Sequence, residues 1–232
     1  MSIAYQLKRS KKRRSLSIKV KDGNVIVYAP DNLELHFIEQ CVLKKRTWIE
    51  KHLKQQSNMD EVPSIIDSSN VCLLGQDYSV SFLVEQNQSL ISTKQNEIIV
   101  QSSRRVAKTR EKQLVLMTQH CTNLMQPYCL KRANQFSKLI NEKVTSVSIK
   151  QFKRRWGSCN NKGDLQFNLQ LISAPLWVLD YVIAHEVAHL REMNHSYRFW
   201  RVVKQLYPKF QIAERWLKEN GYKLDVFKLG VK

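Results

Sequence analysis

The chain has 232 residues, of which 43% are hydrophobic and 25% are charged. This composition is ordinary for a soluble globular protein and excludes disordered and collagen-like chains. A chain of this length forms one or two domains and buries about 70–75% of its unfolded surface, so its core needs no disulfide to hold it. No apolar run reaches the ~18 residues of a membrane span. The basic N-terminus lacks the apolar core of a signal peptide, which predicts a cytoplasmic protein.

The cysteines predict reduced thiols. They are odd in number, widely scattered and without a CxxC pair, which does not fit a disulfide framework or a four-thiolate zinc site. They are Cys41, Cys72, Cys121, Cys129 and Cys159.

Positive charge is the first functional signal, because the formal net charge is +18. It is unevenly spread: residues 1–55 hold 13 Lys and Arg against 5 Asp and Glu, residues 103–155 hold 13 against 2, and residues 56–102 hold 1 against 6. Such a field attracts polyanions and anionic small substrates. A nucleic acid or a nucleotide is therefore a candidate partner, although no nucleic-acid-binding motif accompanies the charge.

The first 102 residues are predicted to form a β-rich region with one helix. Alternating and β-branched residues favour strands, and Asp22-Gly23 is a hairpin signal. The expected strands span residues 4–9, 16–21, 24–28, 71–83, 90–93 and 97–101, with a basic turn at 8–14, a helix at 33–53 and a polar loop at 54–71.

Residues 103–232 are predicted to form a second domain, which makes the fold class α+β. Apolar periodicity indicates a long helix over 104–141, and later helices over 175–190, 196–206 and 212–220. Strands are expected at 144–151 and 165–171. A tight polar turn at 160–164 lies between them and predicts a hairpin.

The most informative stretch is His185-Glu186-Val187-Ala188-His189, an H-E-x-x-H pattern at the end of an apolar helical segment. Residues four apart lie on one helix face, so His185 and His189 can offer two imidazole nitrogens to one metal ion. Glu186 lies about 100° around the helix, beside the metal. That is where a general base must stand to take a proton from an activated water, so the pattern predicts a zinc hydrolase that binds one ion.

A catalytic zinc ion usually has a third protein ligand and an open fourth position. His195 is favoured, because imidazole suits zinc and the spacing is compact. The chain must then leave the helix near Met193-Asn194, where Asn tolerates a left-handed conformation. Glu192 and Glu214 are the two alternatives.

Several motifs together resemble the YgjP-like metallopeptidase-domain family, whose members are described as predicted zinc-dependent hydrolases. The resemblance covers the whole chain and is densest from 150 to 205. It implies zinc on His185, His189 and His195, Glu186 as base, and a zincin-like core over 103–232 built from a long helix, a small sheet, a metal-binding helix and closing helices. The chain is more distantly similar to SprT-like and Wss1-like metalloproteases. The matching motifs are Arg155-Trp156-Gly157-Ser158-Cys159, Asn168-Leu169, Val178–Val182, His185–Leu190, Asn194-His195-Ser196 and Phe199-Trp200.

Two further sets of residues are candidates for supporting roles. Negative charge that develops on the attacked group needs a cation or hydrogen-bond donor, for which the candidates are Arg154, Arg155, Tyr197 and Arg198. A ligating histidine normally donates its other N–H to an oxygen, for which the candidates are Asp180, Glu192 and Asn168.

Three functions are compatible with these residues. The first is a zinc metallopeptidase that acts on a peptide or protein. The second is a metal-dependent nucleoside-triphosphate pyrophosphatase of the UTP type, a description that some YgjP-like proteins carry, although the chain lacks a Gly-rich phosphate loop. The third is a non-catalytic, basic nucleic-acid-binding protein, and Glu186 argues against it because a structural zinc site needs no base.

Overall fold

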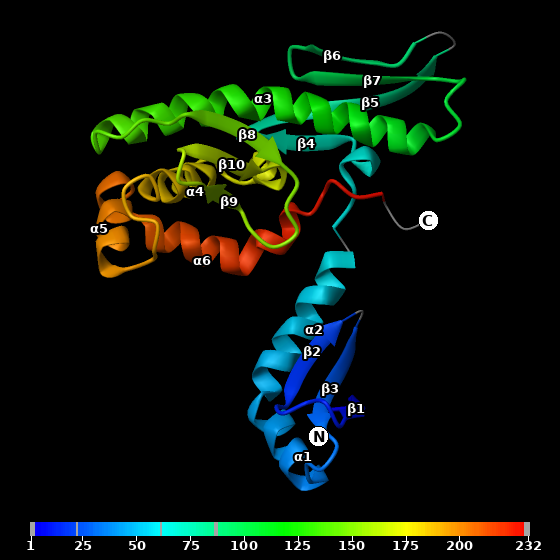
Figure 1. Cartoon of the computed structure of the whole chain (residues 1–232). Helices are drawn as coiled ribbons and strands as arrows, with labels where there is room; N and C mark the ends of the chain where they lie inside the picture. Colours follow the sequence, from blue (N-terminus) through cyan, green and yellow to red (C-terminus); the bar gives the residue numbers. More distant parts are fainter. Residues whose placement is uncertain (1–2, 22, 61, 86–87, 230–232) are drawn as a thin grey trace. The chain divides into compact units, whose positions relative to one another are not determined.

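The computed structural model describes residues 3–21, 23–60, 62–85 and 88–229, and the chain divides into two compact units, Met1–Val62 and Pro63–Lys232. Figure 1 shows the course of the chain through both units. Each unit combines helices with a mixed sheet. The fold class is therefore α+β, as the sequence predicts.

The first unit contains a three-stranded sheet with two helices on one face. Strands β1 (Gln6–Ser10), β2 (Ser17–Lys21) and β3 (Asn24–Pro30) lie in the order β1-β3-β2, with β1 parallel and β2 antiparallel to β3. Alternation along β3 sends every second side chain to the helix-covered face. The core of this unit comprises Val25, Val27, Ala29, Ile38, Val42 and Ile49.

The single helix predicted over 33–53 is two helices, α1 (Leu35–Lys44) and α2 (Arg46–Asp60). Lys45 breaks the run with φ −100° and ψ 9°. No Gly or Pro lies at this position, so nothing in the sequence indicated that the helix would be interrupted here. The polar loop expected from residue 54 is also wrong in its first part, because α2 continues to Asp60 and a 3-10 turn, η1 (Ile65–Asp67), follows.

The second unit begins with a four-stranded sheet. Strands β4 (Asn70–Leu73), β5 (Gln76–Glu85), β6 (Leu90–Lys94) and β7 (Glu97–Ser103) lie in the order β4-β5-β7-β6. The strand expected over 71–83 is a hairpin of β4 and β5. Its turn residues Leu74 and Gly75 have φ of 51° and 75°, which is the left-handed pair that a two-residue hairpin turn requires.

This sheet shares its core with the long helix α3 (Thr109–Leu139). Leu73, Val80 and Ile98 belong to the same buried cluster as Met117 and Cys121 of α3. The division between the units therefore lies at 62/63, which differs from the boundary near residue 102 that the sequence predicts. The predicted boundary rests on the change from strand patterns to helical periodicity near residue 102, and local periodicity does not show which strands share a core with which helix.

A small three-stranded sheet lies beside α3 and precedes the helix with the H-E-x-x-H pattern. Its strands β8 (Ser146–Lys150), β9 (Gly157–Cys159) and β10 (Asp164–Asn168) lie in the order β8-β10-β9. The turn at 160–164 is present, but it joins β9 to β10. The predicted hairpin between residues 144–151 and 165–171 is wrong, because β8 runs parallel to β10. β9 has only three residues, too few to be recognised from alternation.

The remaining elements close the second unit. Figure 1 shows α3 lying alongside both sheets of this unit. None of the helices formed by the described residues has both the length and the apolar character needed to cross a membrane. These elements are η2 (Leu169–Ser173), α4 (Leu176–Ala188), α5 (Tyr197–Leu206), α6 (Phe210–Asn220) and η3 (Gly221–Leu224).

Candidate metal centre

Helix α4 lies in the core of the second unit, and its C-terminal end carries the H-E-x-x-H pattern. Val178, Leu179, Ile183 and Val187 are fully buried. Their burial fixes the rotation of α4 about its axis, so that the opposite side of the helix lines a pocket. His185 and His189 stand one turn apart on that side, with ring centroids 5.2 Å apart.

The chain leaves α4 earlier than the sequence predicts. The helix ends at Ala188, and His189 is its C-cap residue. Tighter backbone bonds follow, from the Leu190 N–H to the Val187 carbonyl and from the Arg191 N–H to the Ala188 carbonyl. The expected exit near Met193-Asn194 is wrong, and Asn194 is not among the residues with positive φ in the described chain. A tighter, 3-10-type final turn takes the place of the expected left-handed residue.

This early exit returns His195 to the first two histidines. The Nε2 atoms of His185 and His195 are 3.1 Å apart, and the ring centroids of His189 and His195 are 4.8 Å apart. Helix α5 begins directly afterwards, where the Ser196 hydroxyl accepts a hydrogen bond from the Phe199 N–H. That cap anchors the backbone next to His195.

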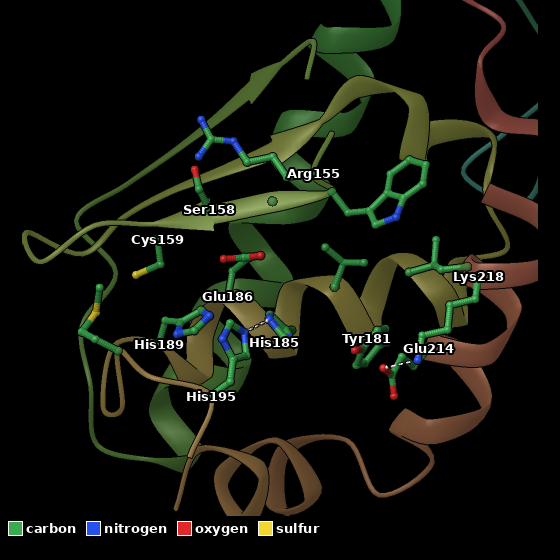
Figure 2. A pocket seen from close by; sticks show the side chains of 15 residues that line it. Arg155, Ser158, Cys159, Tyr181, His185, Glu186, His189, His195, Glu214 and Lys218 are labelled. Carbon is green, nitrogen blue, oxygen red and sulfur yellow. Dashed lines mark hydrogen bonds and ion pairs between the residues drawn. The ribbon is translucent and has the colours of Figure 1, made fainter. Parts of the chain in front are cut away.

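The donor atoms of the three histidines fit a metal ion. One ligand atom from each of His185, His189 and His195 lies within 4.8 Å of the other two, and Figure 2 shows the three rings turned toward one another. The His189 Nδ1–H donates to the Glu192 carbonyl oxygen at 3.1 Å. Since a carbonyl only accepts, this bond leaves the Nε2 lone pair of His189 free for a metal.

Burial keeps His185 in the neutral form that a ligand needs. Desolvation, followed by the neighbouring His189 and His195, lowers the pKa of His185 to about 3. Desolvation also lowers the pKa of His189. Three imidazoles that converge in this way match the ligand chemistry of Zn²⁺ and related divalent ions.

The two alternative third ligands are held elsewhere. Glu192 contacts His189 through its backbone carbonyl. Glu214 forms an ion pair with Lys218, with Oε1 and Nζ 2.7 Å apart. Figure 2 shows this pair at the far end of the pocket from the histidines. Among the described residues, the one group close enough to hold a metal is the three histidines.

Glu186 is buried beside this cluster with only 6% of its surface exposed. Desolvation raises its pKa to about 8, and Arg155 opposes the rise. A divalent cation next to the carboxylate would draw this pKa down again. The backbone of β9 lies against the carboxylate, because a Cβ added to Gly157 would come within 2.6 Å of Oε1 of Glu186.

The cluster opens into a pocket of about 540 Å³. Strand β9 forms one wall, and α4 and α6 form the other. Sequence reasoning missed Tyr181, which lies four residues before His185 on the same side of α4 and is 5% exposed. Its position one turn before the first histidine was the available signal. The lining includes Arg155, Gly157, Cys159, Tyr181, Glu186, the three histidines, Met193, Glu214, Leu217 and Lys218.

The structure brings one of the four candidate charge-stabilising residues to the pocket. Arg155 lines it, but its guanidinium lies 4.4 Å from the Phe152 ring centroid, and Figure 2 shows it directed away from the histidines. Arg154, Tyr197 and Arg198 are not among the described residues that line the pocket. Tyr197 is 79% exposed.

Of the three candidates for orienting a histidine, only Glu192 contacts one. Asp180 accepts hydrogen bonds from Arg132 and Tyr128 at 2.8 and 2.9 Å, so it joins α4 to α3.

Asn168 has a different task from the one predicted. Its side-chain amide donates to the carbonyls of Phe152 and Arg155 at 2.9 and 3.0 Å. The backbone N–H of Asn168 also donates to the Trp156 carbonyl at 2.8 Å. These bonds shape the loop that leads into β9, so Asn168 acts on the wall of the pocket.

The family model described as "YgjP-like, metallopeptidase domain" matches residues 14–220. A solved structure titled as the crystal structure of the metallopeptidase zymogen of Pyrococcus abyssi abylysin matches with 19% identity and a TM-score of 0.36, over 39% of this chain and 93% of that chain. No curated protein matches the chain.

Proposed function

The chain belongs to the YgjP-like metallopeptidase-domain family, and from this premise we propose that it is a zinc-dependent peptidase with Glu186 as its general base. The convergence of His195 on the H-E-x-x-H pair, beside a buried carboxylate and at the end of an open pocket, carries the proposal.

His185, His189 and His195 would hold the ion. Three imidazoles leave one coordination position open, which is the arrangement of catalytic rather than structural zinc sites. When bound, zinc supplies Lewis acidity, which polarises a carbonyl and makes water acidic enough to lose a proton near neutral pH. The hydrogen bond from His189 to the Glu192 carbonyl supports this assignment, because it holds the ring in the tautomer and orientation of a ligand.

Glu186 would move the proton. One of its carboxylate oxygens accepts a proton from the attacking water, and the same oxygen returns it to the nitrogen of the leaving amine. Burial and contact with β9 hold the carboxylate in one place, which lowers the cost of reaching the reactive geometry.

Strand β9 would bind the substrate backbone. It pairs with β10 on one side and is the last strand of its sheet among the described strands. An extended peptide can add to such an edge through its own N–H and C=O groups. A strand edge along the pocket wall favours a peptide over a nucleotide, whose phosphates need a different cradle.

The test compares zinc content and hydrolysis in the parent, Glu186→Gln and the control Glu219→Gln. Glu219 is an exposed residue of α6 that does not line the pocket. We expect about one zinc per chain in all three proteins, and cleavage of a mixed peptide library by the parent and the control alone. Elemental analysis and mass spectrometry give the two readouts.

Two results would contradict the proposal. Cleavage by Glu186→Gln at the parent's rate would remove the base from the mechanism. Release of pyrophosphate from UTP by zinc-stripped protein supplied with magnesium, with no peptide cleavage under any condition, would favour the pyrophosphatase alternative.

A further inference from the structure

The N-terminal unit has a second sheet face, opposite the one that its helices cover. Val25, Val27 and Ala29 point to the helices and are at most 4% exposed. The intervening Ile26 and Tyr28 point the other way and are partly exposed. This basic sheet face, as we name it, consists of Ile26 and Tyr28 with their cross-strand neighbours Gln6, Lys8, Ser17 and Lys19.

The positive charge of the unit is concentrated on the sheet side. Residues 1–30 hold eight Lys and Arg and one acidic residue, Asp22, which lies outside the described residues. Residues 31–62 hold five Lys and Arg against six Asp and Glu. The helices are thus nearly neutral, and the excess charge belongs to the strands and the β1–β2 turn. The exposed cations of residues 3–30 are Lys8, Arg9, Lys11, Lys12, Arg14, Lys19 and Lys21.

Tyr28 stands at the centre of this face with two cations over its ring. The Arg13 Cζ atom is 4.8 Å and the Lys19 Nζ atom is 5.4 Å from the ring centroid. The Arg13 guanidinium also donates to the Ser17 hydroxyl at 3.0 Å. Arg9 is used differently, since it donates to the carbonyls of Asp31 and Leu33 and holds the turn after β3. Arg13 and Tyr28 therefore form a platform that is planar, aromatic and cationic at once.

A face that combines lysines with an aromatic and guanidinium platform favours one class of polyanion over the others. Single-stranded nucleic acid offers phosphates to the lysines and unstacked bases to an aromatic or guanidinium plane. In a duplex the bases are stacked on one another inside the helix, so they cannot stack on the Tyr28 ring. A lipid surface needs large exposed apolar side chains, and those of this unit stand on the helices, at Leu35, Phe37, Leu43 and Trp48.

We propose that the basic sheet face of the N-terminal unit binds single-stranded nucleic acid, with Tyr28 and Arg13 as the stacking platform and Lys8 and Lys19 as phosphate contacts. The site is separate from the three-histidine cluster and does not depend on hydrolysis.

The experiment measures binding of the full chain to fluorescent dT15, U15 and a 15-base-pair duplex by anisotropy at several salt concentrations. Lys8→Gln/Lys19→Gln is compared with Lys44→Gln/Lys51→Gln, a pair of exposed helix lysines in the same unit that removes the same charge. We expect Lys8→Gln/Lys19→Gln, the sheet pair, to bind single strands at least about fivefold more weakly than the parent. The slope of log affinity against log salt should fall by about 1.4, which is the loss of two phosphate contacts to a single strand. The helix pair should stay within about twofold of the parent.

Substitutions of Tyr28 test whether bases stack on its ring. Tyr28→Leu should weaken binding to the single strands by about fivefold or more, whereas Tyr28→Phe, which keeps the ring, should not. Glu186→Gln should bind as the parent does, which separates this proposal from the peptidase. Dichroism spectra verify that each variant is folded, and the two charge pairs remain informative if Tyr28→Leu unfolds. Preference for dT15 or for U15 identifies DNA or RNA as the source of the strand.

Three results would overturn the proposal. Equal losses in the sheet and helix pairs would mean attraction by net charge alone. Binding of the duplex as tightly as the single strands, with no effect of Tyr28→Leu in the folded protein, would exclude stacking. Binding to phosphatidylserine vesicles without binding to either oligonucleotide would assign the face to a membrane.

Discussion

Gly157 and Glu186 are in such close contact that no other residue fits at position 157 without displacement. A Cβ at Gly157 would lie 2.6 Å from Oε1, 2.7 Å from Cγ and 2.8 Å from Cδ of Glu186. The glycine is therefore needed for close approach of the strand β9 to the helix α4. It couples the wall of the pocket to the group that we propose as the base.

Gly157→Ala is the sharpest test of this contact. The added methyl group must displace either the Glu186 carboxylate or β9, and a misplacement of about 1 Å lowers rates roughly 100-fold. We expect a loss of peptide hydrolysis of that size with unchanged zinc content, since the three histidines are untouched. Steady-state kinetics and elemental analysis measure the two quantities.

The control for this variant is Ser158→Ala, a change in the same strand that removes an atom instead of adding one. Ser158 lines the pocket and its hydroxyl donates a long bond of 3.3 Å to Gln166. Ser158→Ala leaves the backbone groups of β9 in place, so loss of the hydroxyl should cost little. Parent-like activity of Gly157→Ala would show that Glu186 does not act from its observed position.

His195 and Glu214 distinguish the possible third ligands. We expect His195→Ala to weaken zinc binding by more than the ~10–100-fold typical of an outer contact, and Glu214→Gln to retain about one zinc per chain. Zinc at 100 times its dissociation constant should stabilise the parent by about 2.7 kcal/mol and should not stabilise His195→Ala. Competition with a chelator and thermal unfolding measure these effects. Zinc loss in Glu214→Gln alone would reverse the assignment.

Asp180 is expected to matter for stability and not for chemistry. Its side chain is 17% exposed and binds Arg132, which is 29% exposed. Removing one partner of a partly buried pair leaves the other without compensation, so Asp180→Asn should destabilise the protein by about 1–3 kcal/mol. Denaturant unfolding gives the free energy. A fall in kcat of the folded variant larger than a few-fold would place Asp180 in the active site after all.

The thiols should react in an order set by burial. Desolvation raises the pKa of Cys121 to about 12 and that of Cys159 to about 11, and it raises the pKa of Cys129 further. A raised pKa means less thiolate at neutral pH, and the thiolate is the nucleophile. Desolvation and the neighbouring Asp77 also raise the pKa of Cys72, but its side chain is exposed. Iodoacetamide at pH 7.5 should therefore label Cys72 before the buried Cys121 and Cys129, which should stay unmodified until the chain unfolds. Peptide mass spectrometry reads each site, and early labelling of Cys129 would contradict the described core.

The sequence by itself determined the family, the α+β class and most helices and strands, because these depend on local periodicity. The spacing of His185, Glu186 and His189 settles their relative positions on any helix, since four residues make about one turn. The choice of His195 also followed from ligand chemistry, although the point where the chain leaves the helix did not.

The tertiary structure decided what depends on contacts between distant segments. The parallel pairing of β8 with β10 and the short β9 arise from the sheet as a whole, and no local pattern in 144–171 specifies them. The same holds for the division of the chain at 62/63, because the strands β4–β7 share a core with α3. The direction in which a side chain points could not be predicted from the sequence either. Arg155 and Asp180 have the charges that their predicted roles need, but packing turns the Arg155 guanidinium onto Phe152 and pairs Asp180 with Arg132.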